Sequence, residues 1–138
     1  MTIKLIDQHL SSIPDKRTSL ALIRANAIEY PPTSAVTQAT NRTTGVTVST
    51  LAGSITTNNA SLAAESSASF VVTCPLVAVG DVVVVCQRSG AVGLMTTVEV
   101  IAVAAGSFTI AVMNGNVAAG TAETGAIIIN YAVIRARV

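Results

Sequence analysis

The residue types that perform enzyme chemistry are scarce in this chain of 138 residues. His9 is its single histidine, and a histidine acting as general base needs a rigidly held nucleophile and an orienting group beside it. Cys74 and Cys86 have no second His or Cys group with them to complete a zinc tetrahedron. We therefore expect no catalytic residue, no cofactor-binding residue and no metal ligand, and we expect His9 to be an ordinary surface residue.

The carboxylates and glycines give no stronger signal for catalysis. Each acid after residue 35 is isolated among apolar or small residues; these acids are Glu65, Asp81, Glu99 and Glu123. Asp81 follows Gly80 at a predicted turn, where an aspartate bonds to the local backbone. Residues 115–120 have the glycine spacing of a phosphate-binding loop, but Thr121 and Ala122 replace the lysine and hydroxyl residue that bind phosphate. The sequence therefore predicts a protein that is not an enzyme.

The composition indicates which elements carry these residues. Apolar residues make up 51% of the chain and charged residues 11%, against about 25% charged in typical soluble domains. A chain rich in valine, isoleucine and threonine and punctuated by glycine favours strands. A surface with so little charge is poorly protected against association, which favours a protein partly covered in an assembly. A compact β-domain with a surface of serine and threonine is the alternative.

Short apolar runs between turn residues predict about eight strands. They cover residues 36–40, 45–49, 51–56, 68–74, 82–86, 95–103, 108–113 and 126–135. Strands at this spacing indicate an all-β fold over residues 35–138, either an antiparallel jelly roll or a β-sandwich of about eight strands.

The apolar faces of these strands predict the core. Its expected members are Phe70, Val83, Val85, Phe108 and Ile129. The run 82–86 is apolar on both faces, which predicts a central strand covered on both sides. Both cysteines lie in or beside apolar runs, so we expect buried free thiols rather than a disulfide.

The N-terminal region differs from the rest of the chain. Residues 1–42 hold eight of the fifteen charges, and three of the four prolines precede residue 35. We expect residues 1–34 to form an N-terminal arm with one short ordered element. The spacing of its apolar residues suits a helix and an alternating strand equally well.

Targeting and charge signals are weak. The N-terminal residues contain no apolar run long enough for a signal peptide, and no stretch approaches the roughly 18 to 20 apolar residues of a membrane span. The net charge of +1 gives no long-range field toward nucleic acid or an anionic membrane. We therefore expect a chain made in the cytoplasm, with no nucleic-acid and no membrane partner.

A series of segments carries a resemblance to a known family. They are VTQATNRTTGVTVSTLAGSITTNNASLA from Val36, then SFVVT, GDVVVV, VAAGSFTIAV and the ending TGAIIINYAVIRA. In their order and spacing, these segments resemble a domain of tailed-phage structural proteins. At this size the chain is similar to the small cement, or decoration, proteins of phage heads. The resemblance covers about 100 residues.

The resemblance implies a jelly roll bound to the outer surface of a phage capsid, where it ties neighbouring capsid subunits together and stabilises the shell. The implied partners are the major capsid protein and further copies of the chain, as a dimer or trimer. The family offers no catalytic residues. A receptor-binding or fibre-tip module is the alternative, because similar domains occur in other virion proteins.

If the arm attaches the chain to a shell, its basic residues meet acidic capsid surface and its apolar residues become buried there. The candidate capsid contacts are Lys4, Lys16, Arg17, Leu20, Leu22, Ile23, Arg24 and Ile28.

Overall fold

The computed structural model describes residues 23–24, 27–28, 33–93, 95–117 and 121–136. The chain divides into two units, Met1–Pro31 and Pro32–Val138. In the first unit, strands β1 (Ile23–Arg24) and β2 (Ala27–Ile28) form an antiparallel pair with Ile23 opposite Ile28. These residues are therefore extended, as the alternating interpretation of the arm predicts.

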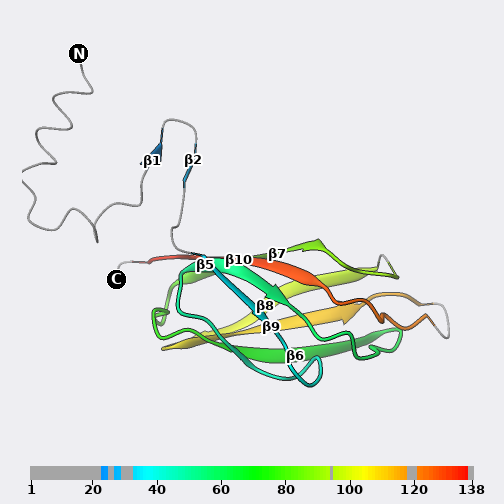
Figure 1. Ribbon diagram of the computed structural model, residues 1–138. Helices are drawn as coiled ribbons and strands as arrows, with labels where there is room; N and C mark the ends of the chain where they lie inside the picture. Colours follow the sequence, from blue (N-terminus) through cyan, green and yellow to red (C-terminus); the bar gives the residue numbers. More distant parts are fainter. Residues whose placement is uncertain (1–22, 25–26, 29–32, 94, 118–120, 137–138) are drawn as a thin grey trace, which may run out of the picture. The chain divides into compact units, whose positions relative to one another are not determined.

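The second unit is a β-sandwich of eight strands in two sheets (Figure 1). The first sheet has the order β3 (Ser34–Thr37), β5 (Ala52–Thr56), β10 (Ile128–Ile134) and β7 (Val82–Ser89). The second has the order β4 (Val46–Thr47), β6 (Ser66–Thr73), β9 (Ser107–Asn114) and β8 (Thr96–Ala104). The described residues contain no helix with the length and hydropathy of a membrane span. The predicted all-β fold of about eight strands is confirmed.

The strand pairing is mixed rather than purely antiparallel. β5, β7 and β10 pair antiparallel in the first sheet, and β6, β8 and β9 do so in the second. The short strands β3 and β4 pair parallel with β5 and β6. The chain passes from one sheet to the other at each step from β3 to β6, so strands two apart in sequence run in the same direction.

The core lies between the two sheets. Inward-facing residues of β10 alternate with outward-facing ones, so Ile129, Tyr131 and Val133 are buried. They face Phe70 and Phe108 of the opposite sheet, and the rings of Phe108 and Tyr131 lie 5.8 Å apart. The predicted burial of Phe70, Phe108 and Ile129 is confirmed.

The predictions for the run 82–86 are wrong in three respects: the strand is not central, its outer face is not covered by any described element, and Val83 and Val85 are partly rather than fully buried. β7 is an edge strand and not a central one, because β10 is its strand partner on one side and no described strand lies on the other. Val83 and Val85 are partly buried against the core, whereas Val82 and Val84 face outward. Cys86 lies on the same outward face as Val82 and Val84 and is exposed, so only the Cys74 thiol is buried as predicted.

The tight turn between β8 and β9 depends on its glycine. Ala105 and Gly106 join the two strands, and Gly106 has a φ of 77° that side chains rarely adopt. Its backbone also closes the neighbouring loop, since Cys74 N–H donates to the Gly106 carbonyl at 2.8 Å and Gly106 N–H donates to the Val77 carbonyl at 2.9 Å.

Candidate functional site

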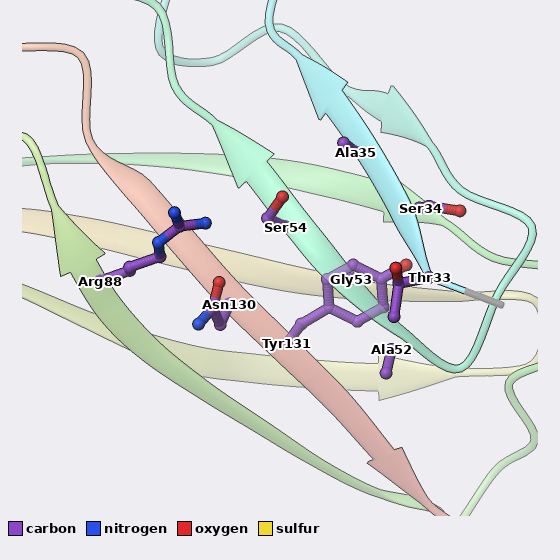
Figure 2. A pocket seen from close by; sticks show the side chains of 9 residues that line it. All are labelled: Thr33, Ser34, Ala35, Ala52, Gly53, Ser54, Arg88, Asn130 and Tyr131. Atoms are coloured by element: carbon purple, nitrogen blue, oxygen red, sulfur yellow. The ribbon is translucent and has the colours of Figure 1, made fainter. Parts of the chain in front are cut away.

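The outer face of the first sheet carries an open hollow of about 370 Å³. Small residues of β3 and β5 form much of its lining, and Figure 2 shows Ser54, Asn130 and Arg88 on three neighbouring strands beside it. The full lining is Thr33, Ser34, Ala35, Ala52, Gly53, Ser54, Arg88, Asn130 and Tyr131. It offers hydrogen-bond donors and one cation but no carboxylate, histidine or thiol. The hollow can therefore hold a polar or anionic group but has no acid–base pair.

Tyr131 has a structural role beneath this face. Its hydroxyl donates to the Thr50 carbonyl at 3.2 Å, and the Thr50 hydroxyl lies 2.7 Å from that of Ser34. Burial raises the pKa of Tyr131 above its ordinary value, against the weaker opposing effect of its hydrogen bonds. The phenol therefore stays protonated near neutral pH and links β10 to the start of β3.

A buried arginine joins several loops at one end of the sandwich. Arg42 is 4% exposed. One of its terminal nitrogens donates to the carbonyls of Glu123 at 3.1 Å and Gly125 at 2.8 Å. Its Nε donates to the Ala60 carbonyl and its other nitrogen lies 3.3 Å from the Thr57 hydroxyl. Burial lowers the pKa of Arg42, and the field of Glu123 opposes this shift. A guanidinium nonetheless remains charged near neutral pH.

The Glu123 carboxylate is fully buried beside this arginine. Its Oε1 accepts from the amides of Val92 at 2.9 Å and Gly125 at 2.6 Å, and its Oε2 accepts from Gly93 at 2.8 Å. Burial alone would raise the pKa of Glu123. The three amides and the charge of Arg42 outweigh it, so the pKa lies below its ordinary value. Glu123 is therefore an ionised clamp between the loop after β7 and the loop before β10.

Gly125 is required by the same clamp. A Cβ atom at this position would lie 2.2 Å from the Gly90 carbonyl oxygen and 2.8 Å from the Glu123 Oε1. The two loops thus approach each other more closely than a side chain allows, and the carboxylate fits between them because residue 125 is glycine.

The opposite end of β7 has a second buried carboxylate. Asp81 accepts from the Ala78 amide at 2.9 Å and from the Ala136 amide at 3.2 Å, and Arg135 lies 3.9 Å away. The Ala78 bond is the main reason that the pKa of Asp81 is lowered, and the Ala136 bond and Arg135 act in the same direction against the effect of burial. The predicted local backbone bond of Asp81 is confirmed, and the carboxylate also holds the end of β10.

These buried groups change the surface of the sandwich. The described part of the second unit has seven charged residues, which are Arg42, Glu65, Asp81, Arg88, Glu99, Glu123 and Arg135. Three of them, Arg42, Asp81 and Glu123, are buried. Four charges therefore remain on a surface that also exposes several large apolar side chains, among them Val79, Val92 and Val117.

The sequence did not reveal the contact between Arg42 and Glu123. The two residues are 81 positions apart, and each is an isolated charge in a long uncharged run. That isolation is the signal that the sequence offers for a buried charge pair, because a charge within apolar surroundings is buried only when hydrogen bonds and an opposite charge compensate it.

The structure offers no metal-binding arrangement in the part of the chain that it describes. Among those residues, no group of three His, Cys, Asp or Glu side chains is close enough to hold an ion. Cys74 and Cys86 are free thiols, and the buried Cys74 Sγ lies 3.6 Å from the Thr50 carbonyl oxygen.

The candidate capsid contacts are only partly within the described residues. Ile23, Arg24 and Ile28 belong to the β1–β2 pair, which places Ile23 and Ile28 opposite each other. Lys4, Lys16, Arg17, Leu20 and Leu22 lie outside the described residues, as does His9.

No protein-family model, no curated protein and no solved structure matches this chain.

Proposed function

We propose that this protein is a virion structural protein that binds the outer surface of a tailed-phage capsid and ties neighbouring capsid subunits together. It is made in the host cytoplasm, its partners are the major capsid protein and further copies of itself, and it performs no catalysis. The location comes from the resemblance of residues 36–138 to phage cement proteins.

The depletion of surface charge supports this proposal most directly. Three of the seven charges in the described sandwich are buried in hydrogen-bonded clamps, and four are left on its surface. A free protein gains solubility from dispersed surface charge, whereas a surface that is covered in an assembly does not need it. Such a surface suits a protein that functions in contact with others.

The two buried clamps support the same role mechanically. A cement protein acts by binding the assembled shell and not its separate subunits, which stabilises the shell by mass action. This requires a body that transmits force without deforming. Ionised carboxylates that hold two loops, or a turn and a strand end, together provide such rigidity without any chemical step.

The decisive experiment compares virions that carry the gene with virions from which it has been deleted. Electron cryomicroscopy should show density for a two-sheet sandwich on the outside of the shell in the first and none in the second. Heating should release DNA from the deleted particles at a lower temperature. Density at a fibre tip would instead support the receptor-binding alternative, and unchanged particles would refute both.

The contribution of the arm is tested by a chain that begins at Thr33. We expect it to melt cooperatively and to bind shells much more weakly than the full chain, because it lacks all eight candidate contacts. Charge reversal at Lys16 and Arg17 in the full chain should slow association with the shell and reduce the weakening of binding by salt, since exposed charges mainly set the association rate and its salt dependence. Equal decoration by the shortened chain would place the attachment surface on the sandwich.

A further inference from the structure

The four sheet edges of the sandwich differ in how they are protected. A free strand edge presents unpaired N–H and C=O groups that can pair with another chain, and proteins usually block it with short strands, charges, prolines or bulges. The β3 edge has four residues and the β4 edge has two. The β8 edge has nine, but it contains the charged Glu99 and a bulge between Val100 and Ala102.

The β7 edge has none of these protections over most of its length. The segment Val82–Gln87 contains no charge and no proline, and its pairing with β10 is regular up to Gln87. Val82 is 53% exposed and Val84 is 49% exposed, although both lie in an eight-residue strand. Among the described residues, β10 is the one strand partner of β7. β7 is therefore the edge strand whose main-chain groups are most open to pairing with a strand of another chain.

We infer that β7 pairs with β7 of a second copy of this chain, antiparallel and about a two-fold axis near Val84. The first sheets of the two copies then form one continuous sheet of eight strands. This inference rests on the self-association in the proposed function and does not depend on the capsid location.

The chemistry of β7 favours a second copy as its partner. A two-fold axis perpendicular to the sheet places residues of the outer face opposite each other, so Val82 would face Cys86 and Val84 would face its own copy. No charge occurs between Val82 and Gln87, so self-pairing brings no like charges together. Because the contact is isologous, it uses both free β7 edges at once and closes the assembly as a dimer rather than a fibre.

The outer face beside this edge adds apolar contact. Ile134 lies opposite Val82 in the β7–β10 register and is also exposed, and Ala132 lies opposite Val84. Pairing of two copies would bring these two patches side by side across the axis. The dimer therefore gains side-chain contacts on the sheet face in addition to its main-chain hydrogen bonds.

Sedimentation equilibrium of the full chain tests the inference in solution, without any capsid. We expect wild type to have twice the chain mass of 14.0 kDa. Val84→Lys should raise the dissociation constant by about 100-fold, because two lysines would meet at the axis. Val71→Lys is the matched control, since Val71 is 48% exposed on the outer face of the other sheet. It should remain dimeric and melt as wild type does, whereas Val84→Lys should still unfold cooperatively but at a lower temperature, because it loses the stabilisation that dimerisation supplies.

Cross-linking provides a second test of the same contact. In a Cys86→Ser background, a cysteine at position 84 should form an intermolecular disulfide readily, because directly opposite residues in antiparallel strands have the Cα separation that a disulfide needs. A cysteine at position 71 should not. The inference is overturned if wild type is monomeric at high concentration, or if Val84→Lys leaves a dimer intact and position 84 does not cross-link. Neither result decides whether the protein decorates phage shells, which the microscopy experiment tests separately.

Discussion

The two ends of the sandwich are each held by a buried carboxylate, but in different ways. At one end of β7, Glu123 accepts three backbone amides and lies beside the buried Arg42, which itself joins further loops. At the other end, Asp81 accepts two amides and has an ion pair with Arg135, whose side chain is about half exposed. The Glu123 end thus has both charges inside the protein, and the Asp81 end has one of them in solvent.

This difference determines how much each end should contribute to stability. A buried charge that loses its partner, or amides that lose their acceptor, cannot be rescued by water, whereas an exposed guanidinium can. We therefore expect the loop structure at the Glu123 end to depend on one carboxylate and the Asp81 end to tolerate change better.

The largest effect is expected for Glu123→Ala. The substitution leaves the buried Gly125 amide and the partly buried Val92 and Gly93 amides without an acceptor and Arg42 without a compensating charge, so the free energy of unfolding should fall by about 3–5 kcal/mol. Denaturant unfolding measures it. Glu99→Ala is the control, because Glu99 is exposed on β8 and should change stability by no more than about 0.5 kcal/mol. Equal losses in the two variants would contradict the clamp.

Low pH should destabilise both ends of the sandwich. The pKa values of Glu123 and Asp81 are lowered in the folded state, so the unfolded chain binds protons first as pH falls. Their stabilisation is complete above the ordinary carboxyl pKa of about 4 and is lost as pH falls through the folded values. The melting temperature, measured between pH 3 and pH 7, should therefore be lowest near pH 3.

Glu123→Gln separates the contribution of one end from this acid response. The amide does not titrate, so the variant should be less stable than wild type at pH 7, and the difference should narrow as pH falls. A difference that is constant over the whole range would mean that the ionised form of Glu123 is not what holds the loops.

A smaller effect is expected for Asp81→Asn. An amide oxygen can still accept one backbone bond, but the charge that attracts Arg135 is lost. The melting temperature should fall less than in Glu123→Ala, and hydrogen exchange should quicken at the Ala136 amide while the Val92 amide is unaffected. Faster exchange at Val92 would show that the two ends are coupled rather than independent.

The smallest effect is expected for Arg135→Ala. The side chain is 51% exposed and its nitrogen lies 3.9 Å from the Asp81 oxygen, a geometry in which a surface ion pair contributes little. No change in unfolding free energy should be measurable in denaturant titration. A clear loss of unfolding free energy would mean that the ion pair with Arg135 stabilises this end more than the backbone hydrogen bonds of Asp81 do.

The positions of the strands were predictable because period and turn chemistry are local properties. The alternation of Ile129, Tyr131 and Val133 identifies the inward face of β10 from the sequence alone. The glycine in the turn between β8 and β9 was equally visible. Arg42 and Glu123 could each be recognised in the sequence as isolated charges. Their contact could not be predicted, because it joins segments that are far apart along the chain.

The sequence by itself determined the all-β class, the eight strand segments, most of the core and the shortage of catalytic groups, since each follows from residue type and short-range spacing. The tertiary structure decided which strands became edges and which charges became buried. Val82 and Val84 are exposed because no described element covers the outer face of the first sheet, which no local pattern specifies. Glu123 is ionised inside the protein because loops distant in sequence meet around it, and such long-range meetings depend on the sheet order that only the folded chain defines.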